Sequence, residues 1–132
     1  MENSIALEAK ILTVSDGVVV GEREDVSGGN LQKLLEESGW VIKKRAVVKD
    51  GSESVASAII ELAEGFHGLI VTTGGTGFGP RDQTPEGTRK VLEREAPGLA
   101  EAMRLTNPLG RLSRAVAGTL GSSLILNVPG SA

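Results

Sequence analysis

The chain has 132 residues, 39% of them hydrophobic, a size that suits one domain (residues 1–132) burying about two-thirds of its unfolded surface. It contains no cysteine, which excludes disulfides, thiolate metal sites and thiol catalysis. No apolar run approaches the roughly 18 residues that a membrane span needs, and no signal-peptide pattern is present, so we expect a cytoplasmic protein with no membrane partner.

The charge is divided unevenly along the chain. Residues 1–65 carry a net charge of −5 and residues 66–132 carry +2, which gives the total of −3. We expect no nucleic-acid partner, because the chain is acidic and has only two Phe, one Trp and no Tyr for base stacking. Arginines of the second half could form part of an anion-attracting cleft, although scattered solvated arginines are the simpler interpretation of each one. They are Arg81, Arg89, Arg104, Arg111 and Arg114.

The first half of the chain alternates between strand and helix patterns. An apolar run predicts a strand over 5–14, and Ser27 can cap a helix that Gly39 ends. A second strand is predicted over 41–48. The four residues that start at Asp50 then have the spacing of a capping box, which predicts a helix over 50–65.

The second half begins with a third predicted strand over 69–73. Prolines in first-turn positions predict two helices, one from residue 85 to about 95 and one from residue 97 to about 106. The last apolar runs, 115–120 and 124–128, flank a glycine–serine turn and predict a hairpin added to the sheet.

This order of elements predicts an α/β three-layer sandwich: a mainly parallel sheet, helices on both faces and a C-terminal hairpin. Ligands of such sheets bind beyond the carboxyl ends of the strands. Asp16, Asp50 and the residues 74–77 each follow a predicted strand directly. We therefore expect these three segments to meet at one edge of the sheet and to form a single site.

The glycine-rich segment after the third strand has the composition of a phosphate-binding turn. Gly74, Gly75, Thr76 and Gly77 stand between a strand and a helix start, where backbone N–H groups and the helix dipole attract anions. A tight strand-to-helix turn is the plainer alternative. The Walker pattern is excluded because no Lys-Ser or Lys-Thr follows, and the dinucleotide fingerprint is excluded because the segment does not follow the first strand.

Two aspartates each have a structural and a functional interpretation. Asp82 could be a surface acid paired with Arg81, an interaction of roughly 0–1 kcal/mol. Beside a phosphate it would need a bridging cation, and Mg²⁺ is the natural one. Asp50 is explained by its place in the capping box alone, worth about 0.5–2 kcal/mol. His67 and Trp40 are expected outside the site, the first in solvent and the second in packing contacts.

The stretch VTTGGTGFGPRDQTPEGT, residues 71–88, resembles the signature of the molybdopterin adenylyltransferases and their close relatives, the Mog/MoaB group of molybdenum-cofactor biosynthesis. The family pattern is close to TTGGTG, a three-residue spacer, RD, one residue and TPE, and all of it is present. Shorter motifs match in order: LTVSD at 12–16, ED-x-SG at 24–28, VVKD at 47–50, LSRA at 112–115 and LNVPGS at 126–131.

The resemblance implies roles for particular residues. The two functional aspartates of the family fall at Asp50 and Asp82, which we expect to be catalytic and to bind the metal. Ser113 matches a serine that handles the pterin. In the segment 24–28, helix capping is as good an explanation as ligand binding. The other expected substrate-binding residues are Ser15, Asp16, Gly74, Gly75, Thr76, Gly77, Arg81, Pro129, Gly130 and Ser131.

The function implied is Mg²⁺- and ATP-dependent adenylylation of molybdopterin, with pyrophosphate as the second product. The resemblance also implies a homotrimer or hexamer, and the molybdate-insertion enzyme as a partner. The alternative is a non-catalytic carrier or scaffold that binds molybdopterin. Both aspartates favour the enzyme, whereas the end at Ala132, where family members continue into a basic segment and a C-terminal helix, favours the carrier modestly. A domain of the molybdate-insertion or CinA type is disfavoured by the complete RDQTPE match.

Overall fold

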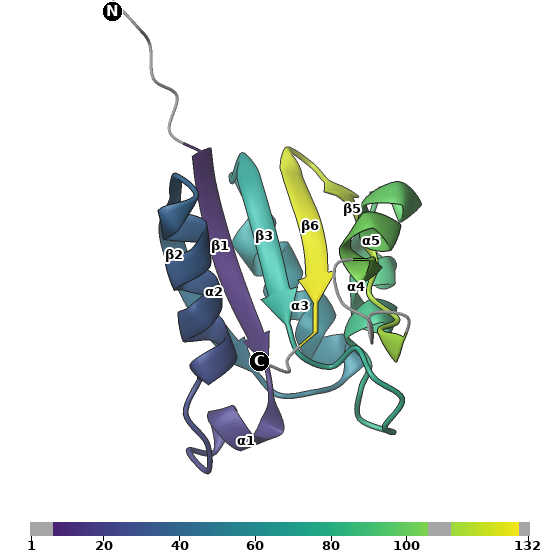
Figure 1. Ribbon diagram of the computed structural model, residues 1–132. Coiled ribbons are helices and arrows are strands. Elements are labelled where there is room, and N and C mark those ends of the chain that lie inside the picture. The colour runs from purple at the N-terminus through teal and green to yellow at the C-terminus, as the bar shows by residue number, and fades with distance from the viewer. Residues whose placement is uncertain (1–6, 106–111, 130–132) are drawn as a thin grey trace, which may run out of the picture.

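The computed structural model describes residues 7–105 and 112–129. In these ranges six strands form one sheet in the order β2-β1-β3-β6-β5-β4 (Figure 1). The neighbours β2, β1, β3 and β6 pair in parallel, and β5 and β4 continue the sheet in antiparallel pairing. The strands are β1 Leu7–Val14, β2 Trp40–Val48, β3 Gly68–Thr73, β4 Arg94–Glu95, β5 Ala117–Leu120 and β6 Ser123–Val128.

Helices cover both faces of this sheet. Figure 1 shows α2 and α5 in front of the sheet and α3 and α4 behind it, with the short α1 below the end of β1. The predicted three-layer α/β sandwich with a mainly parallel sheet and a C-terminal hairpin is therefore confirmed. The helices are α1 Asp16–Val19, α2 Val26–Glu37, α3 Ser52–Ala63, α4 Thr84–Val91 and α5 Pro97–Arg104.

Each face of the sheet carries its own apolar cluster. Successive side chains of a strand point to opposite faces, so Leu12 and Val14 of β1 lie in one cluster and Ala9 lies in the other. The helical spacing of Val55 and Ile59 places both on the inner face of α3, against the first cluster. Trp40 packs against the second cluster, as the sequence predicts. Packing in these two clusters fixes the helices against the two faces of the sheet.

A buried polar network joins β6 to the neighbouring elements. Asn127 is fully buried, and its side-chain amide donates to the hydroxyl oxygens of Thr72 (2.8 Å) and Thr88 (3.1 Å). Its side-chain oxygen accepts from the backbone N–H of Val116 at 3.1 Å. One side chain therefore fixes β3, β6, α4 and the start of the hairpin relative to one another.

Several element boundaries differ from the predictions. The cap of α2 is Asp25, not Ser27: its carboxylate accepts from Gly28 N–H at 3.0 Å and also receives the Thr13 hydroxyl and the Arg45 guanidinium. Burial works against this carboxylate, yet the Arg45 contact and the other hydrogen bonds lower its pKa below the ordinary value. Capping and packing thus account for Asp25.

The helix predicted over 85–95 ends early. α4 stops at Val91, and the following residues pair with β5 instead: Glu93 N–H donates to the Thr119 carbonyl at 2.8 Å, and Ala96 N–H donates to the Ala117 carbonyl at 2.7 Å. The short β4 and the four-residue α1 have no pattern long enough to predict them. Residues 5 and 6 of the first predicted strand, and residue 106 of the last predicted helix, lie outside the described residues.

We expect Asn127→Ala to destabilise the fold by about 1–3 kcal/mol, because it leaves the buried Val116 N–H without an acceptor. Urea unfolding measures the change. The control is Ser122→Ala, at an exposed turn position where the change should stay within about 0.5 kcal/mol. Equal stability of the two variants would contradict a structural role for the network.

Candidate active site

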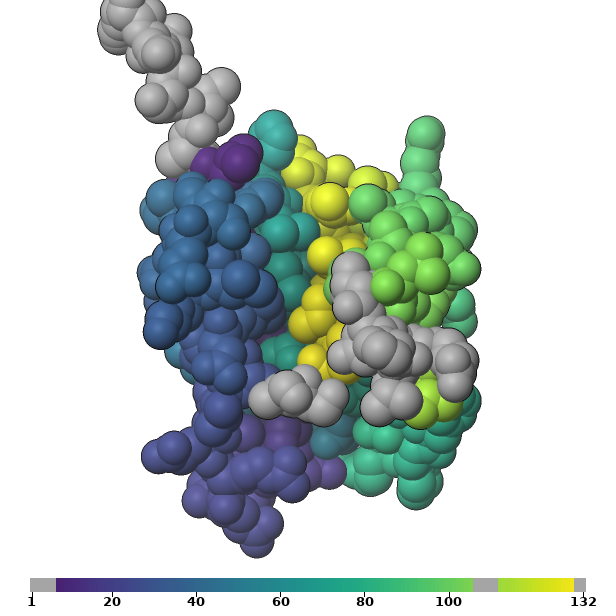
Figure 2. Space-filling view, viewed as in Figure 1, coloured from purple at the N-terminus to yellow at the C-terminus, as the bar shows by residue number. Residues whose placement is uncertain are grey.

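An open cavity of about 1460 Å³ lies at the carboxyl ends of the parallel strands. Segments far apart in the sequence line it: Ser15 and Asp16 after β1, Asp50 after β2, and Pro129 after β6. The turn 74–77 after β3 lines it too. In Figure 2 the surface is hollowed between α2 and α5, with the yellow atoms of β6 at its floor. The predicted convergence of three strand ends at one edge is therefore confirmed.

The glycine turn has a geometry that only glycine accepts readily. Gly74 and Gly75 have φ values of 102° and 72°, in the left-handed region. A Cβ on Gly75 would lie 2.2 Å from Thr84 Oγ1 and 3.3 Å from Asp50 Oδ1. Thr84 holds the turn, since its hydroxyl donates to the Gly74 carbonyl at 2.8 Å and its N–H donates to the Gly75 carbonyl at 3.0 Å. The missing side chain thus lets the backbone lie against Asp50.

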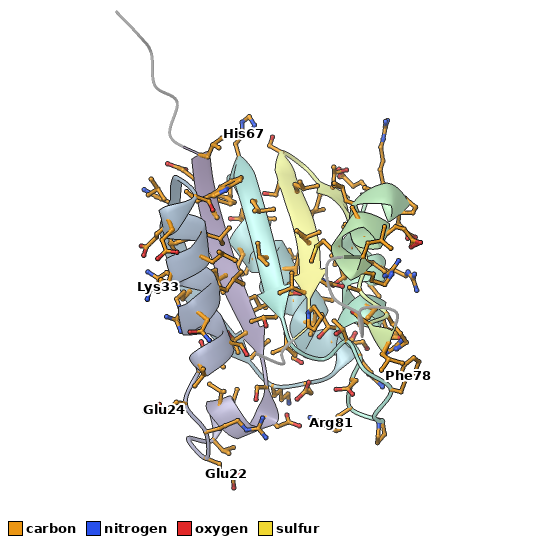
Figure 3. The ribbon with its side chains drawn as sticks, in the orientation of Figure 1. Glu22, Glu24, Lys33, His67, Phe78 and Arg81 are labelled. Carbon is orange, nitrogen blue, oxygen red and sulfur yellow. The ribbon has the colours of Figure 1, made fainter. Side chains whose placement is uncertain are left out.

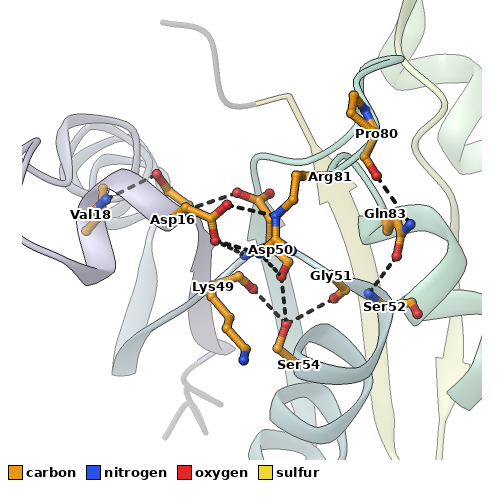
Figure 4. Close-up of polar contacts among 11 residues, drawn as sticks. Asp16, Val18, Lys49, Asp50, Gly51, Ser52, Ser54, Pro80, Arg81 and Gln83 are labelled. Carbon is orange, nitrogen blue, oxygen red and sulfur yellow. Dashed lines mark hydrogen bonds and ion pairs between the residues drawn. The ribbon is translucent and has the colours of Figure 1, made fainter.

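Asp16 and Asp50 form a reciprocal pair of hydrogen bonds across the ends of β1 and β2 (Figure 4). Asp16 N–H donates to Asp50 Oδ2 at 3.0 Å, and Asp50 N–H donates to Asp16 Oδ1 at 3.1 Å. Arg81 closes the pair from the other side: Nε and Nη2 each donate to the Asp16 carboxylate at 3.0 Å, and Nη2 also donates to the Asp50 carbonyl. These contacts connect the turns that follow β1, β2 and β3.

This arrangement corrects the structural interpretation of Asp50. α3 is capped by Gly51, without a side-chain cap, and the Asp50 carboxylate is used by Asp16 N–H instead. The capping-box spacing is therefore present in the sequence but is not formed. Asp50 is left at the edge of the cavity.

The two carboxylates of the pair have opposite pKa shifts. The Arg81 guanidinium lowers the pKa of Asp16 through its hydrogen bonds. Burial raises the pKa of Asp50, and the negative charges of Asp16 and Asp82 raise it further, against the hydrogen bond from Asp16 and the charge of Arg81. The charge of Asp50 is thus less fully compensated than that of Asp16, which Arg81 contacts directly.

Thr84 contacts the start of the glycine turn, and Asp82 lies against its end. Asp82 Oδ2 accepts from Gly79 N–H at 2.9 Å, and a Cβ on Gly77 would lie 3.0 Å from the same oxygen. The turn therefore lies against Asp50 at Gly75 and against Asp82 at Gly77. Both carboxylates line the cavity.

The described residues contain no group of three or more His, Cys, Asp or Glu side chains arranged to hold a metal ion. Mg²⁺ does not need such a group, because it is commonly bound by one or two carboxylates and completes its shell with water and phosphate oxygens. Asp50 and Asp82 supply hard oxygen donors. Burial first, and then the negative charges of Asp16 and Asp82, raise the pKa of Asp50, and a cation would offset those charges. This pair of donors fits Mg²⁺ bound together with a phosphorylated ligand.

The other predicted residues are placed differently from one another. Ser15 lines the cavity, but its hydroxyl oxygen caps α1 by accepting from Val18 N–H. Ser113 lines it too, with its hydroxyl oxygen accepting from Ala115 N–H at 3.2 Å. The Pro129 carbonyl accepts from the Thr73 hydroxyl. Gly130 and Ser131 lie outside the described residues.

The arginines expected around an anion-binding cleft are engaged in protein contacts. Arg81 contacts Asp16 and is not among the residues that line the cavity. Arg89 pairs with Glu95, and Arg104, which does line the cavity, donates to the Ala115 carbonyl. Arg114 pairs with Glu86. Arg111 lies outside the described residues.

His67 is exposed at the far end of the sheet, whereas Arg81 and Phe78 lie at the end that carries the cavity (Figure 3). This position confirms the prediction that His67 faces solvent.

Among the described helices, none is both long and apolar enough to span a bilayer.

Residues 10–132 match a protein family described as a probable molybdopterin binding domain. The chain belongs to this family. It is 37% identical over 129 residues to a protein of Helicobacter pylori named molybdopterin adenylyltransferase, a match that covers 91% of this chain and 72% of that protein. The family membership confirms the resemblance found in the sequence motifs.

Solved structures of relatives have the same fold. A molybdopterin biosynthesis enzyme MoaB from Thermus thermophilus is 43% identical, with a TM-score of 0.86 and coverage of 95% of this chain and 82% of that chain. A molybdopterin biosynthesis protein from Mycobacterium abscessus is 37% identical, with a TM-score of 0.88 and coverage of 94% and 81%. The fold of this chain is thus shared with solved structures of molybdopterin biosynthesis proteins.

We expect Gly75→Ala to destabilise the protein by at least about 1–2 kcal/mol, since an L-residue with a positive φ is strained and its Cβ would overlap Thr84. The matched control is Gly98→Ala in α5, where a Cβ meets nothing within 4 Å. Alanine there should be neutral or stabilising by up to about 1 kcal/mol. Thermal unfolding compares the two, and a Gly75→Ala protein as stable as the control would contradict the close approach.

Asp16 and Asp50 should change the pH dependence of stability in opposite directions. The pKa of Asp50 is raised above 3.8, the ordinary value for an aspartate. Its ionisation in the folded protein therefore costs stability as pH rises from 3.8 through the raised pKa, and Asp50→Asn should be at least as stable as the wild type at pH 7. The pKa of Asp16 is lowered below the same ordinary value, so its ionised carboxylate stabilises the fold at pH values above 3.8. Asp16→Asn should therefore be less stable than the wild type at pH 7.

Both differences from the wild type should shrink as pH falls towards and below 3.8, where the wild-type carboxylates take up protons. Thermal unfolding over a pH series measures them. A less stable Asp50→Asn protein at pH 7, or an unchanged Asp16→Asn protein, would show that the charges are arranged differently.

Proposed function

We propose that this protein transfers the adenylyl group of Mg-ATP to molybdopterin, giving adenylyl-molybdopterin and pyrophosphate. The observation that carries the proposal is the shared placement of Asp50, Asp82 and the glycine turn on one cavity at the strand ends. The names of the relatives support the choice of molybdopterin as substrate. A volume of about 1460 Å³ is larger than the roughly 300–1,000 Å³ of a typical single-ligand pocket, which suits two substrates side by side.

The reaction needs no nucleophile from the protein. An oxygen of the terminal phosphate of molybdopterin attacks the α-phosphorus of ATP and forms a new P–O bond. The bond from the α-phosphorus to the oxygen that bridges to the β-phosphorus breaks, and pyrophosphate leaves with that electron pair. Positioning and electrostatic stabilisation are then the whole task of the protein, which agrees with a chain that has no cysteine and a single remote histidine.

The residues of the cavity divide this task. Asp50 and Asp82 would hold Mg²⁺, which when bound offsets the charge of the triphosphate and of the leaving pyrophosphate. Gly74, Gly75, Thr76 and Gly77 would let phosphate oxygens approach the backbone of the turn. Asp16 and Arg81 would keep Asp50 in place through their shared contacts.

The pterin would occupy the side of the cavity formed by Ser113 and Pro129. The family motif also assigns Gly130 and Ser131 to pterin binding. We further propose a cytoplasmic homotrimer or hexamer that passes its product to the molybdate-insertion enzyme. The location, the oligomeric state and the partner enzyme are proposed from the family resemblance and not from the geometry of the cavity.

The test is pyrophosphate release by the purified protein with molybdopterin and Mg-ATP. We expect release that requires molybdopterin and falls by roughly 100-fold or more in Asp82→Asn, which keeps the shape of the side chain and loses its charge. Glu61→Gln, an equivalent change at an exposed position of α3, should leave the rate unchanged. Binding of molybdopterin without any release would instead indicate the carrier or scaffold alternative.

A further inference from the structure

Arg114 ties the glycine turn to the segment 113–115, whose residues Ser113 and Ala115 also line the cavity. Arg114 lies just before the hairpin, yet its backbone N–H donates to the Thr76 carbonyl at 3.0 Å and its Nε donates to the Gly77 carbonyl at 2.8 Å. Nη2 donates to the backbone carbonyl of Asp82 at 2.5 Å. One residue thus contacts the turn at two carbonyls and the peptide of a candidate metal ligand at a third.

The charge of Arg114 is already committed to the protein. Its Nη1 contacts the Glu86 carboxylate in the first turn of α4, and this hydrogen bond lowers the pKa of Glu86. The side chain is 29% exposed, and the ring of Phe78 lies 5.8 Å from the guanidinium carbon. An arginine held in this way contributes geometry rather than a free positive charge for a substrate.

The glycine turn forms one wall of the cavity, and the sequence neighbours of Arg114 form a second wall beside it. Ser113 and Ala115 line the cavity on either side of Arg114 in the chain, and the Ser113 hydroxyl oxygen accepts from Ala115 N–H. The backbone of 113–115 is therefore linked to the glycine turn through Arg114. The contacts of this residue set the separation between the two walls.

We propose that Arg114 is a positioning residue, which fixes the phosphate-binding turn and Asp82 at a set distance from the Ser113 wall. The inference rests on the proposed function, because the two walls would hold ATP and molybdopterin. Misplacing reacting groups by about 1 Å can cost on the order of 100-fold in rate. A planar guanidinium reaches Gly77, Asp82 and Glu86 together, and the single ammonium of lysine cannot reproduce that fork.

The experiment compares Arg114→Gln and Arg114→Lys with Arg89→Gln, which removes an exposed arginine–glutamate pair between α4 and β4. We expect kcat for pyrophosphate release to fall by about 10- to 100-fold in both Arg114 variants. The KM values for Mg-ATP and molybdopterin should change less than about threefold, because the residues proposed to contact each substrate are not changed. Arg89→Gln should match the wild type in kcat and KM.

Two kinetic results would overturn the proposal: full kcat in Arg114→Lys, or a loss confined to KM, which would make Arg114 a binding residue. Amide hydrogen exchange provides a readout that does not need turnover. In Arg114→Gln the amides of residues 74–82 should exchange at least about tenfold faster, while those of β1 and β3 stay protected and show that the protein is folded. Unchanged exchange in 74–82 would also overturn it, whether or not the wild type releases pyrophosphate.

Discussion

The parallel pairing of β1 with both β2 and β3 is the constraint on which the site depends. It places the residues that follow all three strands at the same edge of the sheet, although they are separated by more than thirty positions in the chain. The backbone of that edge is then joined by side chains: Asp16 and Asp50 exchange hydrogen bonds, and Arg81 connects the third turn to both. The sheet thus supplies a rigid base for three short turns.

The chemistry of the edge follows from how closely these turns approach one another. Glycine at position 75 leaves room for the Asp50 carboxylate and the Thr84 hydroxyl, and glycine at 77 leaves room for Asp82. Three carboxylates consequently gather beside a backbone turn, while one arginine compensates Asp16. The remaining negative charge at Asp50 and Asp82 would repel a polyphosphate without a cation between them. This electrostatic requirement connects the geometry to the proposed use of Mg-ATP.

Arginine has a different role here from the one that composition indicates. The positive balance of residues 66–132 favours a cleft lined by free cations, but Arg81, Arg89, Arg104 and Arg114 each contact a carboxylate or a backbone carbonyl. Their contribution is to hold turns and helices in place. The attraction of phosphate would instead come from the backbone of the glycine turn and a bound cation.

The sequence by itself determined the layered α/β fold, the edge where the strands end and the place of the turn 74–77 at that edge, because hydrophobic periodicity and glycine-rich turns are local signals. The roles of Asp50 and Asp82 rest on the family motifs and stay predictions. The sequence did not determine which polar groups meet. The capping box at Asp50 is not formed because Asp16 N–H takes the carboxylate, and α4 ends at Val91 because β5 offers a pairing partner to the next residues. Arg114 reaches carbonyls as many as 38 positions away in the chain. Only the tertiary structure decides such contacts, since hydrogen bonds depend on distances that parallel strand pairing and chain folding set.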